Sequence, residues 1–251
     1  IKHLSKDIEF KDVTDDLVCL GIFGPKSRDL LSKITDEDLT NKNFKFGTSK
    51  NIKLNSINVW AQRLSYVGEL GYELYIQKEK AKEIYDLIVN TGKDFGLTHC
   101  GAHTMDTMRM ESGFLHWGHD ISPEENQYQA GLNFAISYKK PFNFLGKENL
   151  LKIKSQKLER RFAMLVLKDN TPGKPLLLHE EPIYLDDKII GKTTSGNYSF
   201  NYHKNLSFGY INSEFSNEQL VHKKLYIEIE MKKYPAELLL KPLKSHNFKN
   251  I

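Results

Sequence analysis

Four histidines fall close together in the middle of the chain, where a thiol and a carboxylate also stand. They are His99, His103, His116 and His119, with Cys100 and Asp120 among them. Imidazole, thiolate and carboxylate are the side chains that zinc prefers in proteins. Their spacing matches neither a paired-ligand zinc motif nor the His-Glu-x-x-His helix of a metalloprotease. The pattern therefore favours structural histidines, and we predict that the protein holds no metal.

Motifs for nucleophilic catalysis and for phosphate binding are not found in the sequence. No Gly-x-Ser-x-Gly elbow is present. The segments GIFGP and GELG lack the third glycine and the following helix of a dinucleotide fingerprint. Cys100 stands beside two histidines, but a free cysteine is more often a small buried side chain than a nucleophile. We expect Cys100 to be buried.

One acidic residue, Glu73, stands in a predicted strand between two tyrosines, just after a turn with two glycines. The alternation of side chains puts Tyr72, Leu74 and Ile76 on one face of the strand, and Glu73 and Tyr75 on the other. Acidic residues are uncommon in strands. Glu73 is therefore either a solvated position at a sheet edge or a carboxylate that receives a ligand.

An irregular segment, residues 112–136, combines aromatic and polar side chains with several glycines. It includes Trp117, Asp120, Asn126 and Phe134. Loops that hold such groups between ordered elements are frequent binding sites, and a loop of this length needs a reason to exist. The alternative is a packed crossover that closes off the sheet, and the sequence leaves both open.

Composition excludes several classes of protein. The 251 residues include 36 basic and 32 acidic ones, and the net charge of +4 is spread without long blocks, so no nucleic-acid partner is implied. Two cysteines cannot form a disulfide framework, which favours a reducing, cytoplasmic location. No apolar run approaches the roughly 20 residues that cross a bilayer, so no membrane is expected.

The order of predicted elements indicates an α+β fold in two parts. Strands and helices mix in the first part: two strands are expected on either side of Asn55-Ser56, and a helix that follows the Glu73 strand is expected to stop at Gly96. This mixture predicts a sheet covered on one side by helices. After a lysine-rich helix, five or more short strands follow with turn residues between them, which is typical of a small antiparallel barrel. We therefore predict domains at residues 1–154 and 155–251.

Three separated segments resemble the aminomethyltransferase family. They are RLSYVGELGYELYI, MDTMRMESGFLHWGHDISPEENQYQAGLNFAI and, far downstream, EPIYLDDKIIGKTTSGNYS and LSFGYI with YPAELLLKPL. This family contains the T-protein of the glycine cleavage system and the folate-binding C-terminal half of dimethylglycine and sarcosine dehydrogenases. The run from His116 to Asp120, followed by Ala130-Gly131-Leu132, is more similar to the dehydrogenase branch.

The resemblance implies tetrahydrofolate as cofactor and three residues that bind it. Tyr66 and Glu73 match the family's folate-binding Tyr and Glu, and Phe134 matches an aromatic residue that packs on the folate. A carboxylate accepts both the amino group and the adjacent ring N–H of the pterin edge, which a hydroxyl or an amide does less well. A flat heterocycle also stacks well on an aromatic ring.

The sequence departs from the family at two places. Met105 stands where the T-protein has an Arg, so a charged contact to the folate from that position is not expected. The family's catalytic Asp precedes the equivalent of DVTDDLVCLGIFGP, so we expect it before residue 1, in a segment that this chain lacks. Asp15 and Asp16 receive no catalytic role, and the catalytic residue is unknown.

The resemblance implies transfer of a one-carbon unit to tetrahydrofolate, giving 5,10-methylenetetrahydrofolate from a methylated amine or aminomethyl donor. The expected partners are a small amine or a lipoyl-carrier protein. One alternative is a non-catalytic folate-binding module that docks on a separate flavin-dependent dehydrogenase, since the chain shows no trace of an FAD domain. A further alternative is a demethylase of a methylated sulfur compound.

Overall fold

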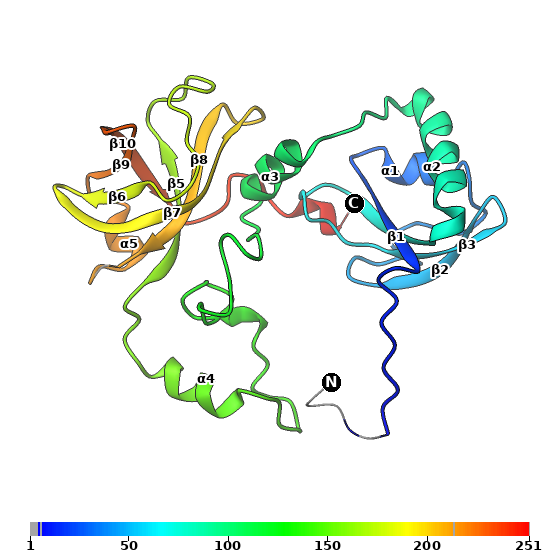
Figure 1. Cartoon of the computed structure of the whole chain (residues 1–251), viewed down its shortest axis with the longest axis horizontal. Helices are drawn as coiled ribbons and strands as arrows, with labels where there is room; N and C mark the ends of the chain where they lie inside the picture. The colour runs from blue at the N-terminus through cyan, green and yellow to red at the C-terminus, as the bar shows by residue number, and fades with distance from the viewer. Residues whose placement is uncertain (1–4, 6, 213, 251) are drawn as a thin grey trace. The chain divides into compact units, whose positions relative to one another are not determined.

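The chain divides into two compact units, which are described separately (Figure 1). The computed structural model describes residues 5, 7–212 and 214–250. Unit 1 comprises residues 1–101 together with residues 246–251, and unit 2 comprises residues 102–245. Within the described residues, no helix is both long and apolar enough to cross a membrane.

Unit 1 is built on a four-stranded antiparallel sheet with the order β1-β4-β3-β2. Its strands are β1 (Leu17–Phe23), β2 (Ser49–Leu54), β3 (Ile57–Gln62) and β4 (Gly71–Gln77). Asn55 and Ser56 join β2 to β3, and both have positive φ, at 43° and 73°. A two-residue turn with positive φ at both positions matches the twist of paired strands. The two strands predicted on either side of Asn55-Ser56 are confirmed.

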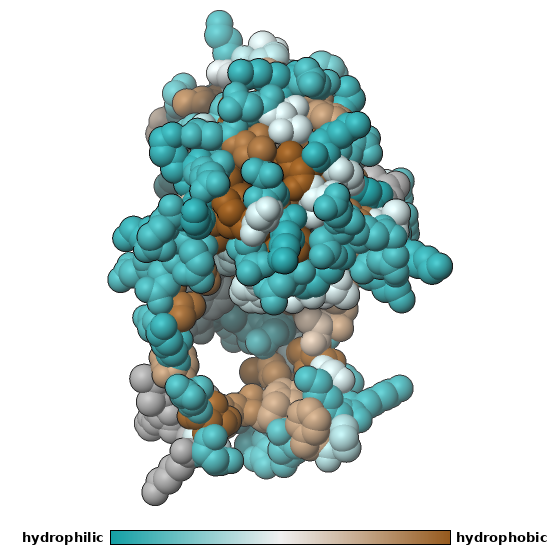
Figure 2. Space-filling view, turned by 90° about the vertical axis from the view of Figure 1, so that its right-hand side faces the viewer, coloured by the Kyte–Doolittle hydropathy of each residue, from teal (hydrophilic) through white to brown (hydrophobic). Residues whose placement is uncertain are grey.

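Two α-helices pack on one face of this sheet: α1 (Ser27–Leu31) and α2 (Lys78–Gly92). In α2 the apolar side chains of Ile84 and Ile88 are buried, and they join the core beneath the sheet. The lysines of α2 lie on its exposed side. Figure 2 is a view from the right-hand side of Figure 1, where unit 1 is drawn, and hydrophilic residues surround a smaller hydrophobic area there. A short 3₁₀ helix, η1 (Lys93–Phe95), follows α2 and ends at Gly96, the predicted stop, whose φ is 71°.

Unit 2 is centred on a closed barrel with the strand order β10-β5-β8-β7-β6-β9, all neighbours antiparallel. The strands are β5 (Arg161–Leu167), β6 (Pro182–Leu185), β7 (Lys188–Ser199), β8 (Lys204–Ile211), β9 (Leu225–Ile229) and β10 (Lys232–Leu239). Closure removes exposed strand edges. Gly191 allows its strand to approach Tyr210 closely, because a Cβ there would collide with the Tyr210 carbonyl. The predicted α+β fold with an antiparallel barrel is confirmed.

Unit 2 also contains short helices. They are α3 (Ala102–Glu111), η2 (Asn133–Ala135), α4 (Lys147–Lys154) and α5 (Asn217–Leu220). Ser216 caps α5, and Gln219 completes the capping box, since each side chain bonds the backbone N–H of the other. The last short helix, η3 (Asn247–Lys249), belongs to unit 1.

The compact units do not divide where the sequence suggests. The sequence predicts a boundary at residues 154 and 155, whereas the division into units falls after Gly101. The helix α3 belongs to unit 2 because it packs against the barrel strands β7 and β8. The domain limits 1–154 and 155–251 stay a prediction.

Candidate functional site

One face of the sheet in unit 1 carries a carboxylate among aromatic and small side chains. Opposite the core, the register sets Cys19, Tyr75 and Trp60 side by side on β1, β4 and β3. The next row on this face holds Gly21, Glu73 and Gln62. We call these six residues the Glu73 face. Because side chains alternate along a strand, the neighbours Tyr72 and Leu74 point the other way and are fully buried.

Glu73 has space beside it on one flank. Its partner across β1 is Gly21, which contributes no side chain. A Cβ at Gly21 would lie 2.6 Å from the ring of Phe23, and a Cβ at Gly71 would collide with the same ring. Phe23 therefore lies flat over two glycine backbones, and any larger residue at either position would displace it. The surface beside the half-buried carboxylate is therefore low. We call this surface, formed by Gly21, Gly71 and the ring of Phe23, the glycine floor.

The carboxylate of Glu73 retains unused hydrogen-bonding capacity. The Tyr75 hydroxyl donates to Glu73 Oε2 at 3.1 Å, which is the one hydrogen bond to this carboxylate within the described residues. An ionised carboxylate offers about four acceptor sites. The rings of Trp60 and Tyr75 lie 5.0 Å apart at 42°, and Trp60 is 42% exposed. The face thus combines an open acceptor with an exposed aromatic surface.

The surroundings of Glu73 raise the pKa of two neighbouring groups. Burial raises the pKa of the Tyr75 hydroxyl to about 12, and the hydrogen bond to Glu73 adds to this shift. Burial raises the pKa of the Cys19 thiol as well, with the charge of Glu73 acting in the same direction. Both groups therefore hold their protons near neutral pH. Tyr75 stays a donor that fixes one oxygen of Glu73 and leaves the other available.

The structure places the three predicted folate-binding residues in both units. Tyr66 is half-buried in the segment between β3 and β4, and Glu73 follows on β4, so both belong to unit 1. Phe134 lies in η2 of unit 2, and 82% of its side chain is exposed. The sequence did not single out Trp60, Gln62 or Cys19, because only the strand register brings them beside β4.

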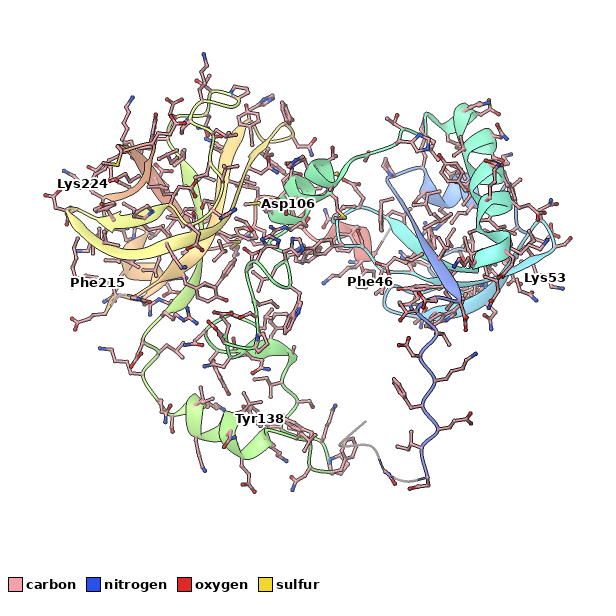
Figure 3. All side chains as sticks on the ribbon, in the orientation of Figure 1. Phe46, Lys53, Asp106, Tyr138, Phe215 and Lys224 are labelled. Atoms are coloured by element: carbon pink, nitrogen blue, oxygen red, sulfur yellow. The ribbon has the colours of Figure 1, made fainter. Side chains whose placement is uncertain are left out.

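A buried ion pair in unit 2 is organised very differently. Arg109 of α3 and Asp120 are both about 1% exposed, and Arg109 Nη1 donates to Asp120 Oδ2. The other donors of Arg109 are also used. Nε donates to Asp106 Oδ1 at 2.7 Å, Nη1 to the Phe114 carbonyl at 3.0 Å, and Nη2 to Ser195 Oγ at 2.7 Å. The guanidinium therefore ties α3 to the barrel strand β7 (Figure 3, near Asp106).

Asp120 is satisfied in the same way. Its Oδ1 accepts from Thr194 Oγ1 and from Ser195 Oγ at 2.8 Å, and its Oδ2 accepts from the His116 backbone N–H at 2.9 Å. With Arg109, this carboxylate accepts four hydrogen bonds and has no room for a ligand. It fastens the loop after α3 to the barrel.

The hydrogen bonds of Arg109 and Asp120 bear on whether residues 112–136 form a binding loop or a packed crossover. Asp120 is used in packing, and Asn126 Oδ1 accepts from the backbone N–H groups of Tyr128 and Gln129, both at 3.0 Å. These two polar groups therefore act within the protein. Trp117 is 65% exposed, like Phe134 an aromatic side chain open to solvent.

Comparison with known proteins assigns the chain to a family. Residues 1–140 match the family model described as the GCVT N-terminal domain. Residues 160–244 match the glycine cleavage T-protein C-terminal barrel domain, which agrees with the position of the closed barrel. The chain belongs to the glycine cleavage T-protein family. The family predicted from the sequence resemblance is confirmed.

Curated relatives and a solved structure agree with this membership. Human mitochondrial dimethylglycine dehydrogenase is 38% identical over 94% of this chain and 27% of its own length. An aminomethyltransferase of Thermoanaerobacter sp. is 33% identical over 93% of this chain and 61% of its own. The fold resembles the glycine cleavage system aminomethyltransferase T of Bartonella henselae, with a TM-score of 0.77 at 19% identity, over 91% of this chain and 60% of that one. The chain thus spans about a quarter of the dimethylglycine dehydrogenase.

Three of the four histidines of this family member take part in two separate contacts. His99 Nε2 lies 2.8 Å from the Tyr85 hydroxyl, and the rings of His116 and His119 lie 4.5 Å apart. No group of three or more His, Cys, Asp or Glu side chains is arranged to hold a metal in the part of the chain that the structure describes. The absence of bound zinc stays a prediction, which elemental analysis tests. Cys100 is exposed, so the expectation that it is buried was wrong. It lies near the end of residues 93–101, where the chain runs along the surface of unit 1.

Proposed function

We propose that this chain binds tetrahydrofolate at the Glu73 face and serves in transfer of a one-carbon unit to it. The observation that carries the proposal is the half-buried Glu73 carboxylate, which has one hydrogen bond and stands beside a glycine floor. Membership of the glycine cleavage T-protein family supports it, since relatives include aminomethyltransferases.

Glu73 suits the edge of a pterin ring. That edge presents an amino group and an adjacent ring N–H, both donors, and a carboxylate accepts two parallel hydrogen bonds with good geometry. Tyr75 holds Oε2 by one hydrogen bond and leaves its remaining lone pairs and Oε1 open. A β-strand is a rigid support for such a group. Glu73 is therefore the residue that would fix the orientation of the ligand.

Tyr66, in the segment that leads into β4 of the same unit, supplies a flat surface suited to a heterocycle. Phe134, which lies in unit 2 and is 82% exposed, keeps a proposed folate-binding role that rests on the family resemblance alone. The chemistry that tetrahydrofolate would supply is a nucleophilic nitrogen that takes up a one-carbon unit at the formaldehyde level. That unit would come from an aminomethyl group, whose amine leaves, or from the iminium that a flavin dehydrogenase makes by oxidising a methylated amine. This chain's proposed share is to bind and orient that nitrogen; no residue is assigned to proton transfer.

The partner that delivers the one-carbon unit is an aminomethylated lipoyl carrier, or the product that a flavin dehydrogenase makes by oxidising a small methylated amine. The second function to be tested is a folate-binding module without its own turnover. The Glu73 face would serve such a module equally well, since no residue there is assigned to proton transfer.

Turnover measurements distinguish the two functions. The chain is incubated with tetrahydrofolate and, in turn, a carrier loaded with an aminomethyl group, or dimethylglycine or sarcosine with a flavin dehydrogenase. We expect 5,10-methylenetetrahydrofolate to form with one donor, and Glu73→Gln to lower the rate at limiting tetrahydrofolate by about 10- to 100-fold. Glu79→Gln, the same change on the exposed side of α2, is the control. Folate binding without product in any arm supports the module; product formation unchanged by Glu73→Gln contradicts the proposed site.

A further inference from the structure

A basic hollow lies in unit 1, apart from the Glu73 face. It has a volume of about 480 Å³ and opens to solvent. Its lining residues are Asn41, Lys42, Lys45, Phe46, Lys249 and Asn250. This volume falls within the range of about 300–1,000 Å³ that is common for small-molecule sites. None of the six residues belongs to the Glu73 face.

The walls of the hollow are held by buried contacts. Arg63, which is 1% exposed, donates from Nη1 to the Asn41 side-chain oxygen and to the Phe44 carbonyl, the latter at 2.7 Å. Asn41 Nδ2 in turn donates to the Asn250 carbonyl at 2.6 Å. A fully buried guanidinium thus fixes one wall and ties it to residues 246–250, which return to unit 1 from the end of the chain.

An aromatic pair forms the apolar part of the same hollow. The rings of Phe46 and Phe248 meet edge to face, with centroids 5.5 Å apart. The ammonium group of Lys249 lies 5.7 Å from the Phe46 ring and 6.0 Å from the Phe248 ring. These contacts hold Lys249 over the hollow, since a cation is attracted to the face of an aromatic ring.

The lysines of the hollow have no acidic partner among the described residues. Lys42, Lys45 and Lys249 are all exposed, and none has a carboxylate within 4.0 Å in the part of the chain that the structure describes. Elsewhere in unit 1, Lys50 does pair, with Glu37 at 3.5 Å. Three like charges around one concave surface raise the local concentration of anions.

We propose that this hollow binds a small anion that carries two or more carboxylate or phosphate groups next to an apolar portion. Lys42, Lys45 and Lys249 would neutralise the anionic groups, while the amide group of Asn41 and the ring of Phe46 would contact the remainder. This site is independent of the proposed folate site, because no residue is shared between them.

Calorimetric titration of the 251-residue chain at low ionic strength tests the proposal. Citrate and inorganic tripolyphosphate are the two probes, and they distinguish a carboxylate ligand from a phosphate ligand. We expect at least one to bind with one-to-one stoichiometry, and Lys45→Gln and Lys249→Gln each to weaken binding about fivefold, the upper range for an exposed charge pair. The double variant should lose about 25-fold.

The matched control is Lys53→Gln, an exposed lysine on β2 that lies well apart from Phe46 in Figure 3. It removes the same charge from the same unit and should leave binding unchanged. Raising the salt concentration should weaken binding, because the screening length falls to about 8 Å at 0.15 M. Binding of neither probe, or an equal loss in Lys53→Gln and Lys45→Gln, would overturn the proposal.

Discussion

Two carboxylates of this protein, Asp120 and Glu73, stand among hydroxyl groups and yet have opposite surroundings. Asp120 is buried and accepts from Arg109, Thr194, Ser195 and a backbone N–H. Glu73 is half-buried and accepts from Tyr75 alone within the described residues. The hydrogen-bonding capacity of Asp120 is used within the protein. Most of the capacity of Glu73 remains available to a ligand.

The contrast shows how a structural carboxylate differs physically from one that is available to a ligand. A buried charge is tolerated only when it is paired and fully hydrogen-bonded, because desolvation costs several kcal/mol per ion. A half-buried carboxylate keeps part of its hydration and can exchange that water for ligand donors. Substitutions at the two sites should therefore act on different quantities, stability in one case and binding in the other.

The largest effect is expected from Asp120→Asn. The substitution removes the buried partner of Arg109 and leaves only the partly exposed Asp106 to pair with it, and breaking a buried pair costs about 3–5 kcal/mol of stability. Urea unfolding followed by circular dichroism measures this loss. The control is Asp106→Asn, which touches the same guanidinium at 2.7 Å but is 30% exposed, and should cost about 1 kcal/mol or less. An equal, small loss of stability in Asp120→Asn and Asp106→Asn would show that Asp120 is not a structural carboxylate. Its contrast with Glu73 would then disappear.

Gly21→Ala should have an intermediate effect and tests the floor beside Glu73. The added Cβ would lie 2.6 Å from the Phe23 ring, which must then shift from its place beside Glu73. Overpacking of this kind costs about 1–3 kcal/mol, and we expect a loss near the lower end together with several-fold weaker tetrahydrofolate binding. Gly101→Ala is the matched control, since nothing lies within 4 Å of its Cβ. Unchanged stability and affinity in Gly21→Ala would show that the floor does not matter.

The smallest effect concerns Tyr75 and appears only at high pH. Its pKa is about 12 in the folded protein, against an ordinary value of 10.0. Between these pH values the folded state binds more protons than the unfolded state, so stability falls as the pH rises from 10 to 12. In Tyr75→Phe this part of the loss should disappear, and the phenolate absorbance should lack one late-titrating group. Loss of a group that titrates near the ordinary value of 10.0 instead would show that the pKa of Tyr75 is not raised.

The sequence predicted local features well because local residues determine them. Gly96 ends the helical segment through its positive φ, and Asn55-Ser56 forms the hairpin turn. The alternation in β4 likewise separated Glu73 from the buried Leu74. Each of these depends on a few neighbouring side chains and on the backbone geometry that they favour.

The surroundings of the two carboxylates could not be predicted, because they depend on residues far apart in the chain. Trp60 reaches Tyr75 through the strand register, and Arg109 meets Ser195 across 86 positions. Nothing in the segment around Asp120 distinguishes it from a ligand-binding acid. Its burial does so, and burial is a property of the folded protein.

Calorimetric titration with tetrahydrofolate tests the central claim most directly, using the wild-type chain, Glu73→Gln and the control Glu79→Gln. The amide of Glu73→Gln sets a donor against the donors of the pterin edge, and loss of a hydrogen bond to a charged group is worth about 1.5–3 kcal/mol. We expect the affinity of Glu73→Gln to be about 10- to 100-fold weaker and its unfolding midpoint to be unchanged. The affinity of Glu79→Gln should equal that of the wild type. Equal affinity for wild type and Glu73→Gln would contradict it and make Glu73 a solvated strand residue.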